Sequence, residues 1–290
     1  MRASDLYRRM AELSAKGECF ATITIIGSKG SSPRGLGAKM IVQEDGSRLG
    51  TIGGDCLEND AVDMALQMLA KEKERRPGER SRPESVVAVK SMLLEEQEVG
   101  GVGMLCGGKV DVLVEIIRPE LKVVVLGSGA VATSIVELAH FLEMNTVLVD
   151  PIPPSIQLPT SSVFLKARHE EGLGELRVDD LTAIVIVTRH KNDVPALTAA
   201  LKTSAGYIGM IGSKHRVQTI FGRVAKEAGV QAGSIPSRVH APVGLDIGAS
   251  TPQEIAVSVL AEVLAYFREG TSQPLALFEP QRRAASVGLH

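Results

Sequence analysis

The fold of this 290-residue chain is decided by residues 122–150, which read KVVVLGSGAVATSIVELAHFLEMNTVLVD. An apolar run from Val123 to Leu126 leads directly into a turn of small residues. An amphipathic stretch follows the turn, and a second strand-like run ends at Asp150. Because a short apolar run, a tight turn, a helical pattern and a second apolar run follow in this order, the stretch predicts a strand-turn-helix-strand unit.

The turn has the G-x-G-x-x-A form of the dinucleotide-binding fingerprint, with Gly127, Gly129 and Ala132 at the three small positions. The first glycine permits the tight turn, the second lets a phosphate approach the backbone, and the alanine lets helix and strand pack closely. The helix N-terminus then presents free N–H groups and a positive dipole end to an anion. Asp150, 23 residues after Gly127, lies about where an acid accepts a ribose hydroxyl. We therefore expect a Rossmann-type unit with a phosphate-binding turn.

The composition excludes several classes of protein. Hydrophobic residues make up 44% of the chain, which is enough for a sizeable core, and the net charge is −2 without a basic block. This charge and the scarcity of aromatic residues argue against nucleic-acid binding. No apolar run approaches the roughly 18 residues of a membrane span, and the N-terminus lacks an apolar signal core. We expect a cytoplasmic protein without a membrane span.

Residues 1–118 are predicted to form a small α+β domain with glycine-rich loops. Two helices are expected, at 4–16 with Ser4 as the N-cap, and from Asp55 to about Lys73 with Asp55 and Glu58 as a capping box. The expected strands are 18–26, 39–43, 47–52, 84–94 and 109–117. The loops 27–39 and 95–108 are rich in glycine, which favours mobile backbone.

Residues 119–270 are predicted to form the Rossmann-like domain. Strand-like runs at 163–165, 183–187 and 207–211 alternate with or precede helical runs at 193–203, 213–228 and 252–268, with Asp193, Ser213 and Thr251 as N-caps. This alternation extends the first unit into a parallel sheet. Residues 271–290 have the composition of a loose tail. The expected fold class is α/β, a C-terminal Rossmann-like parallel sheet domain with a smaller N-terminal α+β domain.

Of the three cysteines, Cys56 is the one best placed for chemistry. It falls in the first turn of an expected helix, directly after Gly53 and Gly54. A helix N-terminus stabilises a thiolate, whereas the neighbouring carboxylates of Asp55 and Glu58 oppose it. The alternative, a small buried hydrophobic residue, stays open.

Cys106 also lies beside glycines, in Met104-Leu-Cys-Gly-Gly108, and either role is open for it, whereas Cys19 opens an apolar strand and is expected to be buried. The odd number and wide spacing of the cysteines argue against structural disulfides. Cys56 and Cys106 suit soft-metal or sulfur chemistry, but their spacing makes no zinc site, so we expect no resident metal.

Three further segments offer groups for binding. The loop 27–39 could hold an anion through its backbone and through Arg34 or Lys39, or it could be a solvated connector. Gly212 and Ser213 end a strand and open a helix, which makes a second candidate phosphate-binding turn. His240 could carry a proton or could be a hydrogen-bonded structural residue.

Together these motifs resemble the XdhC/CoxI family, the accessory proteins of xanthine-dehydrogenase-type molybdenum hydroxylases. The motifs that carry the resemblance are Gly30-Ser-Ser-Pro-Arg34 with Gly37-Ala-Lys-Met40, Gly50-Thr-Ile-Gly-Gly-Asp-Cys-Leu-Glu58, Cys106-Gly-Gly108, the turn at Gly127, Tyr207-Ile-Gly-Met-Ile-Gly-Ser213, and His240-Ala-Pro-Val-Gly-Leu-Asp-Ile-Gly248 followed by Thr251-Pro-Gln-Glu-Ile-Ala-Val-Ser258. They occur in order along nearly the whole chain.

The resemblance implies an N-terminal XdhC domain and a molybdenum-cofactor chaperone. Such a protein binds molybdopterin, either alone or extended to a dinucleotide, supports exchange of an oxo for a sulfido ligand with a cysteine desulfurase as sulfur source, and delivers the cofactor to the apo-hydroxylase. By analogy Cys56 and Cys106 would contact the cofactor or sulfur, and Gly53, Gly54 and Glu58 would shape that site. The chemistry of the first domain would then face the Rossmann unit.

Two departures from the family pattern matter. The third glycine that usually precedes the cysteine is Asp55 here, and Asp150 is followed by Pro151 rather than by arginine, which weakens a claim to a phosphorylated ribose. Two alternatives stay open, an NAD(P)-dependent oxidoreductase that uses His240 as acid–base, and a thiol redox or persulfide carrier that uses Cys56 and Cys106. A maturation factor is favoured over an oxidoreductase. A homodimer is expected only because symmetric dimers are the commonest soluble assembly.

Overall fold

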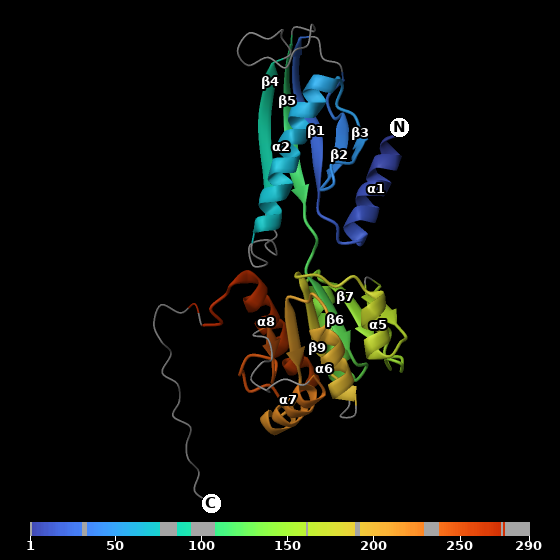
Figure 1. Cartoon of the computed structure of the whole chain (residues 1–290), viewed down its shortest axis with the longest axis vertical. Coiled ribbons are helices and arrows are strands. Elements are labelled where there is room, and N and C mark those ends of the chain that lie inside the picture. The colour runs from blue at the N-terminus through green and yellow to red at the C-terminus, as the bar shows by residue number, and fades with distance from the viewer. Residues whose placement is uncertain are drawn as a thin grey trace, which may run out of the picture.

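The computed structural model describes residues 2–30, 34–75, 86–93, 108–160, 162–188, 192–228, 238–273 and 275. It contains two sheets that follow each other along the chain, an antiparallel one before Arg118 and a parallel one after it (Figure 1). This arrangement confirms the expected fold class, an α/β chain with a Rossmann-like parallel sheet and a separate antiparallel sheet in the N-terminal region.

The first sheet has five strands in the order β3-β2-β1-β5-β4. Its strands are β1 (Phe20–Gly30), β2 (Lys39–Gln43), β3 (Arg48–Gly50), β4 (Val86–Leu93) and β5 (Gly108–Ile117). Helix α2 (Asp55–Glu74) packs on one face, and α1 (Ala3–Ala15) packs on the other face over β1 and β2. The side chains of β5 alternate between buried and partly exposed, because successive residues of a strand point to opposite faces.

Two predicted element boundaries in this part of the chain were wrong. Strand β1 continues to Gly30, four residues into the expected loop, because its end pairs with the start of β5 after a register shift beyond Ile25. Helix α1 begins at Ala3 and has Arg2 as N-cap, so Ser4 lies inside the helix.

Two predictions for single residues were also wrong here. Cys19 is only half-buried, although it opens an apolar strand. The N-cap of α2 is Gly54 rather than Asp55, because the helix begins one residue earlier than expected and takes Asp55 as its first residue.

The second sheet has six parallel strands in the order β11-β10-β9-β6-β7-β8. The strands are β6 (Lys122–Leu126), β7 (Asn145–Val149), β8 (Ser162–Leu165), β9 (Thr182–Ile186), β10 (Tyr207–Met210) and β11 (Val239–His240). Helices α4 (Ala130–Phe141) and α8 (Pro252–Arg268) cover one face, and α5 (His169–Glu175), α6 (Asp193–Leu201) and α7 (Lys214–Ala228) cover the other. Alternate residues of β6 enter the two cores, which is why this strand is apolar throughout.

The chain order creates a topological switch point between β6 and β9. From β6 the chain builds outward through β7 to β8, and it then crosses to β9 on the other side of β6. In open parallel sheets of this kind, ligands bind outside the carboxyl ends of the strands at the switch point. The candidate site is therefore sought at this edge.

The amino-terminal edge of the parallel sheet faces the first unit. Strand β6 begins five residues after β5 ends, and the Arg177 guanidinium donates a hydrogen bond to the carbonyl of Lys16 at 3.0 Å. Because all strands run the same way, the carboxyl edge points away from the antiparallel sheet (Figure 1).

The expected capping box at the start of α8 is confirmed. The Thr251 hydroxyl accepts the N–H of Glu254 at 3.2 Å, and the Glu254 carboxylate accepts the N–H groups of Thr251 and Ser250 at 2.9 and 2.8 Å. These backbone hydrogen bonds lower the pKa of Glu254 from 4.5 to about 2. The charged carboxylate thus fixes the entry into a helix that packs against α4.

We predict that Glu254→Gln flattens the acid limb of the stability profile. A carboxyl group with a depressed folded-state pKa contributes stability above its ordinary pKa, and this contribution is lost as the pH falls from about 4.5 towards 2. Urea unfolding between pH 3 and pH 6 should show a smaller dependence on pH in the variant than in the wild type. Glu137→Gln, at an exposed position of α4, is the control, and equal profiles for both variants would contradict the prediction.

Candidate functional site

The turn after β6 lies directly against the end of β9. Gly127 has φ = 128°, and a Cβ at this position would lie 2.5 Å from the carbonyl oxygen of Val187. The Gly127 N–H donates to the carbonyl of Val149 at 3.0 Å, and the Val187 N–H donates to the carbonyl of Leu126 at 2.8 Å. Only glycine fits this position, because both the conformation and the close approach exclude a side chain.

Gly129 differs from Gly127 because no neighbour forces it to be glycine. Its φ of −75° is open to any residue, and a Cβ added to it would have no described atom within 4 Å. It is the N-cap of α4, which receives no side-chain cap from the described residues, and the first helical hydrogen bond runs from the Thr133 N–H to the Gly129 carbonyl at 3.0 Å. Behind the turn, Ala132 is fully buried. The first turn of α4 thus offers backbone donors to an anion beside open space.

Asp150 lies at the carboxyl end of the neighbouring strand β7. Its Oδ1 atom accepts the N–H of Ile152 at 2.7 Å, which closes a local turn. Its Oδ2 atom lies 3.6 Å from Nε2 of His169, too far for a hydrogen bond. His169 is 3% exposed, and its Nε2 atom has no hydrogen-bond partner in the described part of the chain. A buried polar atom left unpaired costs about 1–3 kcal/mol.

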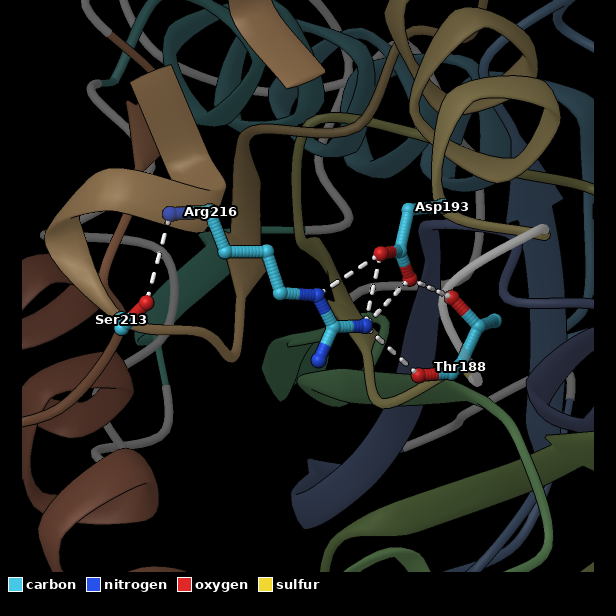
Figure 2. A network of polar contacts seen from close by, with 4 residues as sticks. All are labelled: Thr188, Asp193, Ser213 and Arg216. Carbon is cyan, nitrogen blue, oxygen red and sulfur yellow. Dashed lines mark hydrogen bonds and ion pairs between the residues drawn. The ribbon is translucent and has the colours of Figure 1, made fainter. Parts of the chain in front are cut away.

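On the other side of the switch point, Arg216 ties three elements together (Figure 2). Its Nε and Nη2 atoms donate to the carboxylate of Asp193 at 2.6 to 2.9 Å, and Nη2 also donates to the carbonyl of Thr188 at 3.1 Å. The Thr188 hydroxyl donates to the same carboxylate at 2.6 Å. Asp193 is 2% exposed, so its charge is neutralised almost entirely within this network.

The network corrects one predicted cap and places two candidate residues. Asp193 is the first residue of α6 and the N-cap is Asn192, so the carboxylate pairs with Arg216 instead of capping the helix. Ser213 does cap α7, because its hydroxyl accepts the N–H of Arg216 at 3.2 Å (Figure 2). A Cβ at Gly212 would make only ordinary contacts with Arg216 and Val217.

His240 is held by groups that the sequence did not identify. Its Nδ1 atom lies 2.7 Å from Oε1 of Glu262 on α8, and its ring stacks on Tyr207 with centroids 4.4 Å apart. Glu262 also accepts the N–H of Gly244. Burial alone would raise the pKa of Glu262, but the hydrogen bonds from His240 and Gly244 outweigh it and hold this pKa below its usual value. Burial and the nearby Glu262 carboxylate raise the pKa of Tyr207.

The position of His240 separates it from the glycine-rich turn. Strand β11 lies three strands from β6, which corresponds to roughly 14 Å at the usual strand spacing. The histidine thus anchors the loop after β11 to α8, and the structure does not bring it next to Gly127, Gly129 or Asp150.

The glycines before α2 form a second candidate site. Gly53 and Gly54 have φ of 96° and 77°, values that favour glycine. The Glu58 carboxylate accepts the N–H groups of Ile52 and Gly53 at 3.1 and 3.0 Å, and the hydroxyl of Thr51. The predicted capping box with Asp55 is therefore wrong, and Glu58 instead fixes the turn that precedes the helix.

The cysteines of this candidate site are not tested by the structure. The side chain of Cys56 and the whole of Cys106 lie outside the described residues. Arg34, in the nearby loop, is exposed. Among the described residues no group of His, Cys, Asp and Glu is arranged to hold a metal ion.

The two candidate sites lie at opposite ends of one protomer (Figure 1). Glu72, near the end of α2, pairs with Arg118 of the connection at 2.7 Å, so this end of the helix adjoins the parallel sheet. The turn at Gly53 is at the other end of α2, roughly 25 Å away. Since the carboxyl edge of the parallel sheet also points away from the connection, a single protomer does not place the chemistry of the first unit against the Rossmann turn.

A doubly wound parallel sheet with a glycine-rich turn, preceded by an antiparallel α+β unit, defines a two-part class of nucleotide-binding fold. Within this class, residues 123–263 match the model of the XdhC Rossmann domain, and residues 13–77 match that of the XdhC and CoxI family. Together the two matches cover most of the chain, which belongs to the XdhC and CoxI family.

Three relatives are similar over large parts of the chain. The uncharacterized protein YqeB of Escherichia coli K12 is 32% identical over 90% of this chain and 46% of its own length. A probable xanthine dehydrogenase component of Bacillus subtilis is 27% identical over 53% of this chain and 45% of its own length. The molybdenum cofactor insertion chaperone PaoD of E. coli K12 is 24% identical over 89% of this chain and 86% of its own length. The chain thus spans about half the length of the first two relatives.

We predict that Arg216→Met destabilises the protein by about 3–5 kcal/mol, because it leaves the buried carboxylate of Asp193 without its partner. Urea unfolding at pH 7 measures the effect. Arg223→Met, at an exposed position of the same helix, is the matched control and should change the free energy of unfolding by less than about 0.5 kcal/mol. Equal losses in the two variants would show that the network in Figure 2 does not stabilise the fold.

Proposed function

We propose that this chain binds the molybdenum cofactor at the carboxyl edge of its parallel sheet and acts in the maturation of a xanthine-dehydrogenase-type molybdenum hydroxylase. Membership of the XdhC and CoxI family supports this role, as does the likeness to a molybdenum cofactor insertion chaperone. The observation that carries the proposal is the first turn of α4, whose backbone donors lie beside open space at Gly129.

The residues at this edge fit the phosphate of such a cofactor. The backbone N–H groups that open α4 would hold the phosphate oxygens, Gly127 would keep the turn tight, and Gly129 would leave room for the approach. Asp150 would meet the ribose if the cofactor is a dinucleotide. The bound group would supply the metal centre of the client hydroxylase, and the chain itself would bind and orient it.

Sulfuration would belong to the first unit. We place the sulfur-handling thiols at Cys56 and Cys106, with a cysteine desulfurase as the sulfur source. The Gly53–Gly54 turn would admit the cofactor, and Glu58 would hold this turn in place through the N–H groups of Ile52 and Gly53. We also propose a division into domains at 1–118 and 119–270 with a tail at 271–290.

A homodimer in the cytoplasm is the proposed working form. Because the two candidate sites lie at opposite ends of one protomer, a second copy is one way to bring a cysteine-bearing loop to the Rossmann edge. The partners would be the apo-hydroxylase and the desulfurase. None of the described helices is both long and apolar enough to cross a membrane.

The oxidoreductase alternative receives no support from the placement of His240. That residue lies about three strand spacings from β6, and its Nδ1 atom is engaged by Glu262. The role of a thiol redox or persulfide carrier is an additional candidate only through Cys56 and Cys106, which the described residues do not test.

We predict that Gly129→Val lowers the affinity for molybdopterin about tenfold or more while the melting temperature stays within a few degrees of the wild type. The added side chain meets no described neighbour in the fold but fills the space that a phosphate needs. Anaerobic titration followed by pterin fluorescence measures the affinity, and Gly222→Val, at an open position of α7, is the control.

Two outcomes would contradict the proposed function. The first is unchanged pterin affinity in Gly129→Val, which would move the cofactor away from this turn. The second is a protein that does not bind the pterin but binds and consumes NADH, which would favour the oxidoreductase.

A further inference from the structure

The pair formed by Asp150 and His169 is the feature of the parallel sheet that the fold leaves incomplete. His169 is buried, and its Nε2 atom points at Oδ2 of Asp150 from 3.6 Å without reaching hydrogen-bond distance. Buried polar atoms in native proteins nearly always have a partner, so an unpaired one calls for an explanation. Within the described part of the chain, no other group pairs with this nitrogen.

Close packing keeps the histidine in this place. Gly172, on the same helix, lies so close to Val149 of β7 that a Cβ at this glycine would collide with the valine side chain. Leu173 is buried against the same sheet face. The unpaired nitrogen therefore cannot escape to solvent by a small shift of α5, and Asp150 is the group that can move toward it.

Asp150 is also the residue of this pair that a ligand can reach. Its side chain retains 14% exposure, whereas that of His169 retains 4%. The residue before it, Val149, accepts the N–H of Gly127, so the carboxylate follows directly on the strand position that holds the phosphate-binding turn. A ligand with its phosphate at the first turn of α4 would carry its next sugar towards this carboxylate.

We propose that the carboxyl edge of the sheet binds a ribonucleotide, and that His169 is a positioning residue for the carboxylate that takes the ribose hydroxyls. The inference rests on the phosphate site of the proposed function and names the class of ligand. One carboxylate oxygen stays with the Ile152 N–H, and the other accepts a ribose hydroxyl together with the Nε2–H of His169. A shift of less than about 1 Å brings the histidine into hydrogen-bond range.

The same geometry selects against a phosphorylated ribose. The carboxylate of Asp150 would face a 2′-phosphate with like charge, and the pair offers that phosphate no arginine or lysine. The site is therefore built for a free 2′,3′-diol, whichever base the nucleotide carries.

Calorimetric titration of the full chain with ADP and with 2′,3′-dideoxy-ADP tests the inference. The wild type should prefer ADP about tenfold or more, the effect of hydrogen bonds to a charged group. His169→Leu should reduce the preference to less than about threefold with little change in the affinity for dideoxy-ADP. His169→Gln, which keeps a donor near the position of Nε2, should restore most of the preference. Glu170→Gln, on the same helix, is the control and should keep it.

Three results would overturn the inference: absence of ADP binding, equal affinity of the wild type for both nucleotides, or an undiminished preference in a folded His169→Leu protein. Pterin titration of the same samples separates this inference from the proposed function. Pterin binding without ADP binding would remove the ribonucleotide and leave the cofactor chaperone. The expected ADP preference without pterin binding would do the reverse.

Discussion

The contact between Gly127 and the carbonyl of Val187 is the constraint on which the candidate site depends. It sets the turn after β6 directly against the end of β9, so the switch point has no room for a side chain at this position. The same turn directs the chain into α4, whose first backbone donors then lie at the carboxyl edge. The remaining groups at this edge, Asp150 after β7 and Arg216 after β10, are arranged around that crossing point. Parallel strands gather all these loops at one edge, which is why residues far apart in sequence meet there.

The sequence predicted the parts of the structure that depend on local pattern. The strand-turn-helix-strand unit at 122–150, the parallel sheet and the capping box at Thr251 and Glu254 are all observed. Each depends on residues a few positions apart, for which hydrophobic period and hydrogen-bonding side chains are sufficient signals.

The parts that depend on distant partners were missed or misassigned. The acid that binds His240, Glu262, is 22 residues away on another helix. Asp193 was expected to cap its own helix, but Arg216 neutralises its buried charge from α7. Glu58 was given a capping role, although it holds the turn before the helix. His169 had no sequence signal. For Asp193 and Arg216 a signal did exist, because both follow parallel strands and the carboxyl ends of such strands share an edge.

The separation of the two glycine-rich sites bears on the kind of protein this is. An enzyme that used both sites in one step would need them within contact distance, and one protomer places them at opposite ends of the molecule. A factor that holds a cofactor at one site and handles sulfur at another has no such requirement within one chain. The second site can meet the cofactor in a partner copy or in a client enzyme. This geometry agrees with a role in cofactor maturation, the role that the family relationship supports.

The central claim is that the cofactor binds at the turn after β6, and amide hydrogen exchange with and without molybdopterin under anaerobic conditions tests it most directly. The account predicts slower exchange in residues 128–132 on binding, because the bound phosphate occupies the backbone donors at the start of α4. Protection confined to the antiparallel sheet and its loops, with unchanged exchange in residues 128–132, would contradict it.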